Sequence, residues 1–183
     1  MPVSVATYKR VALEDPEGQR ELVCGRLRSK PPMIAEHNEV MDALDEQLRS
    51  QLSRKDYAIR INSGRLRIST GTYYVPDVTV IPRAFVKLQL RHAPSDLEVY
   101  EQPMPLVVEV WSRSTGEYDV RDKLLEYQWR GDLEIWRIHP YAKTLTAWRR
   151  KPDGSYEETL HRTGTVTLVA LPAVAIEVES LFE

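Results

Sequence analysis

The sequence has very little cysteine and no long apolar run. Cys24 is the only cysteine among 183 residues, which excludes an internal disulfide bond and a metal site built from several cysteines. No apolar stretch approaches the ~18 residues that a helix needs to span a bilayer, so we expect no membrane partner. The first residues mix charged side chains with prolines too early for a secretory signal, and we therefore expect a cytoplasmic protein.

An excess of positive charge is also missing. The formal net charge is −2 and the pI is about 6.1. These values exclude a strongly basic protein that coats nucleic acid, but not an enzyme that contacts nucleic acid transiently. The chain has no glycine-rich phosphate loop and no Gly-x-Ser-x-Gly frame, and its four histidines are not spaced as zinc ligands. The composition fits one globular domain over residues 1–183, with a loosely ordered lead over 1–18.

Periodicity predicts an α/β (α+β) fold with a mixed central sheet flanked by helices. Helices are expected over 35–54 and 114–131, with a shorter one near 8–14. The strand–helix–strand order over 104–139 is typical of a crossover between parallel strands. We expect a long loop over 83–102, and strands or hairpins over 20–28, 56–62 with 65–70, 73–82, 104–111, 133–139, 144–150 with 155–162, and a final strand or short helix over 174–182.

Two acidic residues interrupt strands that otherwise consist of apolar residues. Asp77 follows Pro76 in YYVPDVTVIP (73–82), and Glu109 lies in MPLVVEVW (104–111). A single acid of this kind can lie at a strand end or cap a backbone group. Two acids on neighbouring strands raise each other's pKa unless a cation lies between them, and carboxylate oxygens are ligands that Mg²⁺ prefers. We therefore predict a Mg²⁺ site, which Mn²⁺ can also occupy, where the metal activates water and polarises a phosphodiester.

Lys123 adds a positive charge to this pattern. It lies on the helix after Glu109 and shares one helical face with Asp119 and Tyr127. Lys123 is either a solvated partner of Asp119 or a cation that stabilises the negative charge of a reacting phosphate. Between residues 60 and 91 lie further basic residues, which are either solvated or in contact with a nucleic-acid backbone. They are Arg60, Arg65, Arg67, Arg83, Lys87 and Arg91.

Five blocks of the sequence, in order, resemble the Uma family of restriction-endonuclease-like proteins, within the PD-(D/E)XK nuclease superfamily. The resemblance implies a restriction-endonuclease-like fold, a DNA partner, a homodimer and Mg²⁺-dependent hydrolysis of DNA phosphodiester bonds. The blocks are RELVCGRLRSKPPMIAEHNEVMDALDEQL, VPDVTVI, PLVVEVWSRST, DVRDKLLEYQWRGDLEIWRIHP and LPAVAIEVESLF.

The resemblance also implies roles for individual residues. Asp77 and Glu109 match the metal-binding acids, and the carbonyl of Val110 is a further candidate ligand. The superfamily's usual lysine, two residues beyond the acid, is absent, and Lys123 on the following helix replaces it. Glu21 matches an early glutamate that adds a ligand or positions water. His37 matches a histidine at a helix start, where a cap or a surface hydrogen bond is an equal alternative.

Three positions depart from the family pattern. Arg113 replaces a proline, His139 replaces an aspartate and Ala173 replaces a glycine. None of these changes removes the acids or the lysine, and Arg113 beside the site is a candidate phosphate contact.

Three functions remain compatible with these residues. The first is a Mg²⁺-dependent endonuclease that cleaves DNA. The second is a catalytically inactive nuclease fold that binds DNA or a protein, and the third is an enzyme that acts on another phosphate-containing substrate. Geometry separates the first two, because the enzyme requires Asp77, Glu109 and Lys123 to meet beside a pocket.

Overall fold

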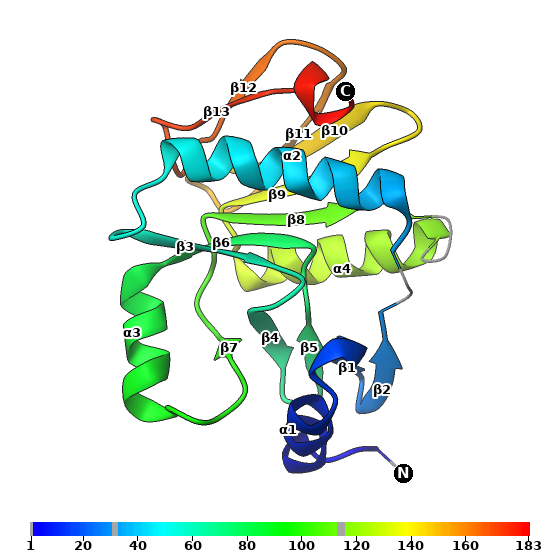
Figure 1. Cartoon of the computed structure of the whole chain (residues 1–183), viewed down its shortest axis with the longest axis vertical. Coiled ribbons are helices and arrows are strands. Elements are labelled where there is room, and N and C mark those ends of the chain that lie inside the picture. The colour runs from blue at the N-terminus through cyan, green and yellow to red at the C-terminus, as the bar shows by residue number, and fades with distance from the viewer. Residues whose placement is uncertain (1, 31–32, 113–115) are drawn as a thin grey trace.

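The computed structural model describes residues 2–30, 33–112 and 116–183, the side chains of residues 17 and 116–120 excepted. Figure 1 shows the arrangement of its helices and strands. The helices are α1 (Val5–Glu14), α2 (Ala35–Gln51), α3 (Arg83–His92) and α4 (Gly116–Arg130), with short 3₁₀ turns η1 (Pro16–Gly18) and η2 (Glu179–Leu181). The strands are β1 (Arg20–Val23), β2 (Arg26–Ser29), β3 (Tyr57–Ile61), β4 (Arg65–Ser69), β5 (Thr72–Tyr74), β6 (Val78–Pro82), β7 (Val99–Tyr100), β8 (Leu106–Val110), β9 (Glu134–His139), β10 (Thr144–Arg150), β11 (Tyr156–His161), β12 (Thr165–Thr167) and β13 (Ala175–Glu177).

The strands form two large sheets where the sequence predicts one. The central sheet has the order β11-β10-β9-β8-β6-β3, and a second sheet has the order β2-β1-β5-β4-β7. In the central sheet β8 and β9 are parallel and are joined through α4, so the predicted crossover is confirmed. The predicted mixed α/β architecture is therefore confirmed, while the number of sheets is a correction.

The chain passes between the two sheets at two places. The chain runs from β3 in the central sheet to β4 in the second sheet, and it returns from β5 in the second sheet to β6 in the central one. β3 pairs with β6 and β4 pairs with β5, so residues 56–62 and 65–70 do not form the predicted hairpin. The stretch 73–82 is likewise not one strand, because Val75, Pro76 and Asp77 form the bend between β5 and β6.

The central sheet is covered on both faces (Figure 1). Side chains of β8 alternate, so that Leu106 and Val108 pack in a cluster with α2 and the C-terminal segment, while Val107 packs in another cluster with Tyr127 of α4. These positions are fully buried, which explains why the strand consists almost entirely of apolar residues. Glu109 shares the face of Val107, so its carboxylate lies on the α4 side of the sheet.

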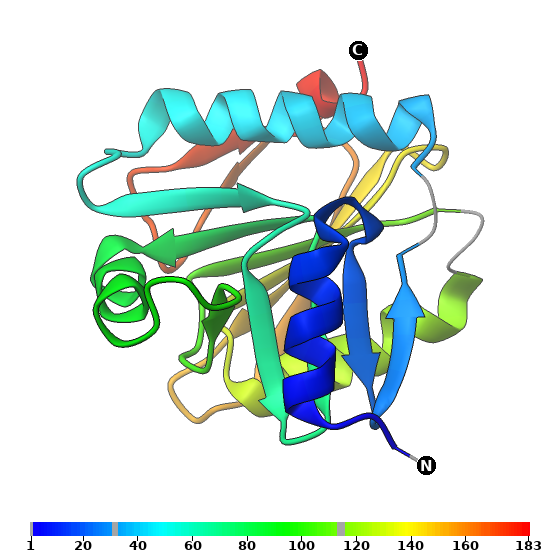
Figure 2. The ribbon, with the colours of Figure 1, turned by 60° about the horizontal axis from the view of Figure 1, so that its bottom comes forward.

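Two other predictions need correction. The expected loop over 83–102 contains the helix α3 and the short strand β7. The lead is also more regular than expected, since α1 begins at Val5 and Tyr8 of this helix is completely buried. Figure 2 shows α1 running alongside the strands of the second sheet, beside β1. In the part of the chain that the structure describes, no helix combines the length and the apolar character needed to cross a membrane.

Candidate active site

The site lies where four segments come together on one side of the molecule. These are the ends of β2 and β8, the beginning of α2 and the first turns of α4 (Figures 1 and 2), and β1 and the bend between β5 and β6 contribute Glu21 and Asp77. Asp77 precedes the first residue of β6, and the pairing of Val78 with Val108 makes it the neighbour of Glu109 in the adjacent strand. The bend at Pro76 therefore brings the two acids together, although they are 32 positions apart in the sequence.

Asp77 is buried and its carboxylate is held from several sides. Its Oδ1 accepts a hydrogen bond from Lys30 Nζ at 2.5 Å, and its Oδ2 accepts one from the Val110 backbone N–H at 2.7 Å. His37 Nε2 lies 3.3 Å from the same Oδ2. Burial by itself would raise the pKa of Asp77, but the charge of Lys30 and the hydrogen bond from His37 outweigh it and lower the pKa. Asp77 is therefore ionised at neutral pH.

Glu109 is also buried, but its charge is less well compensated. Its Oε1 accepts hydrogen bonds from the hydroxyl of Tyr127 at 2.6 Å and from Lys123 Nζ at 3.4 Å. Burial raises the pKa of Glu109, and the negative charges of Asp77 and Glu21 add to this effect, although Lys123 opposes it. Among the described residues no hydrogen bond to Oε2 is found.

Lys123 lies between two carboxylates. Its ammonium is 2.9 Å from Glu21 Oε1 and 3.4 Å from Glu109 Oε1, and it lies 4.9 Å from the centre of the Tyr74 ring. Burial would lower the pKa of Lys123, but Glu109 and Glu21 outweigh it and raise the pKa above its ordinary value. Glu21 is fixed in turn by the backbone N–H of Val75, at 2.8 Å from Oε1.

The structure thus brings together the four side chains that the sequence singled out as Asp77, Glu109, Lys123 and Glu21. Their catalytic and metal-binding roles stay predictions, as does the role of the Val110 carbonyl. His37 also reaches this cluster, while its Nδ1 is buried and has no partner in the part of the chain that the structure describes. Arg113 and the side chain of Asp119 lie outside the described residues.

The sequence did not indicate two further members of the cluster. Lys30 lies after the last residue of β2, in a polar stretch with no periodicity, and no motif marks it. Tyr74 looks like an ordinary strand residue, although it lies beneath the ammonium of Lys123. Tyr127 was placed on the face of Lys123 by its spacing, and the structure adds its contact with Glu109.

The donor set fits a hard divalent cation. Among the described residues no group of three or more His, Cys, Asp or Glu side chains is arranged to hold a metal ion. Mg²⁺ is nevertheless commonly bound by only one or two carboxylates, together with water and substrate phosphate. Asp77 and Glu109 supply two such carboxylates, and both lie buried side by side at the ends of adjacent strands.

A cavity of about 520 Å³ opens beside Lys123 and Glu21. Tyr74 forms part of its wall, and two exposed arginines of β2, Arg26 and Arg28, line it as well. Its volume lies within the ~300–1,000 Å³ that is usual for ligand pockets. The cavity gives the lysine and the glutamate an opening through which a phosphate group can approach.

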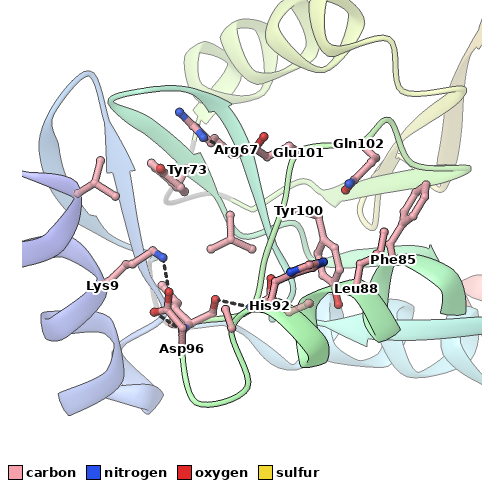
Figure 3. A pocket seen from close by; sticks show the side chains of 15 residues that line it. Lys9, Arg67, Tyr73, Phe85, Leu88, His92, Asp96, Tyr100, Glu101 and Gln102 are labelled. Carbon is pink, nitrogen blue, oxygen red and sulfur yellow. Dashed lines mark hydrogen bonds and ion pairs between the residues drawn. The ribbon is translucent and has the colours of Figure 1, made fainter.

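A second cavity of about 460 Å³ lies elsewhere, between α1, α3 and the second sheet (Figure 3). Here Lys9 pairs with Asp96. Three of the six basic residues that were candidates for nucleic-acid contact are engaged in internal contacts with other side chains: Arg67 pairs with Glu101, Arg60 pairs with Glu98 and Arg65 Nε donates to the hydroxyl of Tyr8. The contact of the six with a nucleic-acid backbone stays a prediction.

Comparison with known proteins identifies the family of the chain. A family model described as "Putative restriction endonuclease" matches residues 5–180. The chain belongs to this family, Uma2. The family inferred from the five sequence blocks is thereby confirmed, and membership of Uma2 supports a nuclease function.

A solved structure shows the same fold. The crystal structure of "a putative nuclease belonging to DUF820" from Anabaena variabilis ATCC 29413 is similar to the Uma2 chain with a TM-score of 0.77. The similarity covers 99% of this chain and 98% of that one at 16% sequence identity, so it concerns the fold alone. A comparison with curated proteins gave no match.

Proposed function

We propose that this protein is a Mg²⁺-dependent endonuclease that hydrolyses phosphodiester bonds in DNA. The observation that carries the proposal is the meeting of Asp77, Glu109 and Lys123 in one buried cluster beside a cavity. Buried carboxylates next to a protonated lysine are costly for the folded state, so their presence in a concave site favours a functional role.

Asp77 and Glu109 would hold the metal, with the Val110 carbonyl as a further ligand. A bound Mg²⁺ would polarise the phosphodiester and lower the pKa of an attacking water. The hydroxyl of Tyr127 fixes Glu109 through Oε1. The Val110 N–H and His37 fix Asp77 through Oδ2 in the same way.

Lys123 acts as a fixed positive charge. Because its pKa is raised, it stays protonated at neutral pH and is not the base that removes a proton from water. Its ammonium donates to the phosphate oxygens on which negative charge develops in the transition state. Glu21 holds this ammonium at 2.9 Å, in addition to Glu109 at 3.4 Å.

DNA would reach the site through the cavity lined by Lys123. Arg26 and Arg28 alternate on the edge strand β2, so both side chains lie on one face of the strand about 7 Å apart. One guanidinium group can donate two parallel hydrogen bonds to the oxygens of a phosphate. The two arginines are therefore suited to hold the DNA backbone on either side of the scissile bond.

The test is a cleavage assay with purified protein on supercoiled and linear DNA, with single-stranded DNA and RNA as further substrates. Cleavage should require Mg²⁺ or Mn²⁺ and should fall by at least ~100-fold in Asp77→Asn and Glu109→Gln. Asp42→Asn on the exposed side of α2 is the matched control and should cleave as the wild type does.

Two outcomes would overturn the proposal. One is the absence of cleavage of every nucleic acid with either metal, together with identical metal titrations of the wild type and Asp77→Asn. The other is cleavage that survives both acid substitutions. RNA cleavage without DNA cleavage would correct only the substrate. The homodimer stays a prediction, which the sedimentation velocity of the same samples would check.

A further inference from the structure

The ammonium of Lys30 is surrounded by oxygen atoms. Its Nζ lies 2.5 Å from Asp77 Oδ1, 2.9 Å from the Val75 carbonyl oxygen and 2.9 Å from Asn62 Oδ1. The side chain of Lys30 is only 9% exposed. A lysine ammonium has three N–H donors, so these three acceptors use its full hydrogen-bonding capacity. Three hard oxygens around one buried positive charge are also the surroundings that a divalent cation selects.

The two oxygens of Asp77 are not equally available to a metal. Oδ2 already accepts the N–H of Val110 at 2.7 Å and faces Nε2 of His37 at 3.3 Å. Oδ1 faces Lys30 and receives no other hydrogen bond from the described residues. A metal that binds Asp77 would therefore use Oδ1, and it would meet the positive charge of Lys30 at the same oxygen.

We propose that Lys30 competes with the metal for Asp77 and thereby weakens metal binding by the protein alone. This inference rests on the proposed function, because it takes Asp77 as a metal ligand. Lys30 is here a positioning residue and takes no part in the chemistry itself. It keeps Asp77 ionised and in place until a divalent cation replaces its ammonium at Oδ1.

Competition of this kind links metal binding to substrate binding. A DNA phosphate brings further oxygen ligands for the metal and a negative charge that offsets Lys30. The metal then binds more tightly in the presence of DNA, and by linkage DNA binds more tightly in the presence of the metal. The free protein holds little metal at concentrations at which the complex with DNA is loaded.

The inference is tested by calorimetric titration of the metal-free protein with Mn²⁺ in the absence of DNA. Lys30→Met removes the charge and keeps most of the apolar stem, and its Kd for Mn²⁺ should be at least tenfold lower than that of the wild type. Lys30→Gln, which keeps an N–H donor for the same oxygens, should shift the Kd in the same direction. Lys55→Met, at an exposed lysine before β3, is the matched control and should leave the Kd unchanged.

A gain in affinity separates competition from a purely structural role. If Lys30 only supported the fold, its loss would leave metal binding unchanged or weaken it, and either result in both variants overturns the inference. Adding Asp77→Asn to Lys30→Met should abolish the gain. Wild-type binding that equals binding by both Lys30 variants, or no binding by either variant, refutes competition but leaves the proposed function intact. The proposed function is refuted separately, by the cleavage assay.

Discussion

Replacing Tyr127 by phenylalanine removes a single oxygen atom from the centre of the site. Tyr127 is completely buried, and its hydroxyl donates to Glu109 Oε1 at 2.6 Å. The ring also meets Tyr74 edge-on, with centroids 5.8 Å apart, and phenylalanine keeps this contact. The substitution therefore isolates one hydrogen bond to a buried carboxylate.

The expected loss is worked from that contact. A hydrogen bond to a charged group contributes about 1.5–3 kcal/mol to the free energy of unfolding. Tyr127→Phe should lose about this amount at a pH where Glu109 is ionised. The pKa of Glu109, already raised by burial, should rise further because a donor to its ionised form is gone. A proton then competes more strongly with the metal, so the affinity for Mn²⁺ at fixed pH should fall.

Urea denaturation followed by circular dichroism measures the first effect, and metal titration measures the second. Tyr156→Phe is the matched control, since that hydroxyl donates at 2.6 Å to a neutral acceptor, the backbone oxygen of Asp132. It should cost about 0.5–1.5 kcal/mol and leave the metal affinity unchanged. The prediction is refuted if Tyr127→Phe is as stable as the wild type, or if Tyr127→Phe and Tyr156→Phe bind Mn²⁺ with the same affinity.

Three further predictions concern Lys123, Glu109 and the distant residue Glu134. Lys123→Met should reduce the rate of DNA cleavage by about 10²–10³-fold while the circular dichroism spectrum is retained, and a wild-type rate would contradict its proposed role. The affinity for Mn²⁺ should weaken as the pH falls through the pKa of Glu109. Because that pKa is raised, the affinity should begin to decline above pH 4.5, the ordinary glutamate value. Mn²⁺ titrations in which the affinity declines only below pH 4.5 would contradict this prediction. Glu134→Gln should lower the free energy of unfolding by about 1.5–3 kcal/mol in urea without changing cleavage per folded molecule, because this fully buried carboxylate accepts from Trp136, Arg149 and the Val169 N–H.

Several elements could be predicted from the sequence because their signals are local. The apolar spacing of α2, the turn between β10 and β11 and the apolar run of β8 depend on residues that are close together in the chain. α3 was missed, since it buries only Val86 and its basic residues resemble a solvated loop. Asp77 and Glu109 could be identified from the sequence because each is a charged residue in a stretch that is otherwise apolar.

Strand pairing could not be predicted to the same degree. Residues 57–61 and 65–69 alternate like two arms of a hairpin, yet β3 pairs with β6 and β4 pairs with β5. Alternation shows that one face of a strand is buried, but it does not show which strand lies beside it. The sequence showed that Pro76 interrupts a strand. It did not show that the two halves, β5 and β6, belong to different sheets and that the chain bends between them.

The sequence by itself determined the family, the mixed α/β architecture and the acids at positions 77 and 109, because blocks of residues and breaks in pattern are properties of the chain alone. The resemblance also pointed to Lys123 as the cation beside these acids, whereas Lys30 is known only from the tertiary structure. Lys30 is 47 positions from Asp77, and no spacing rule links such a pair. Electrostatic partners are set by distance in space, and the bend between the two sheets creates that proximity.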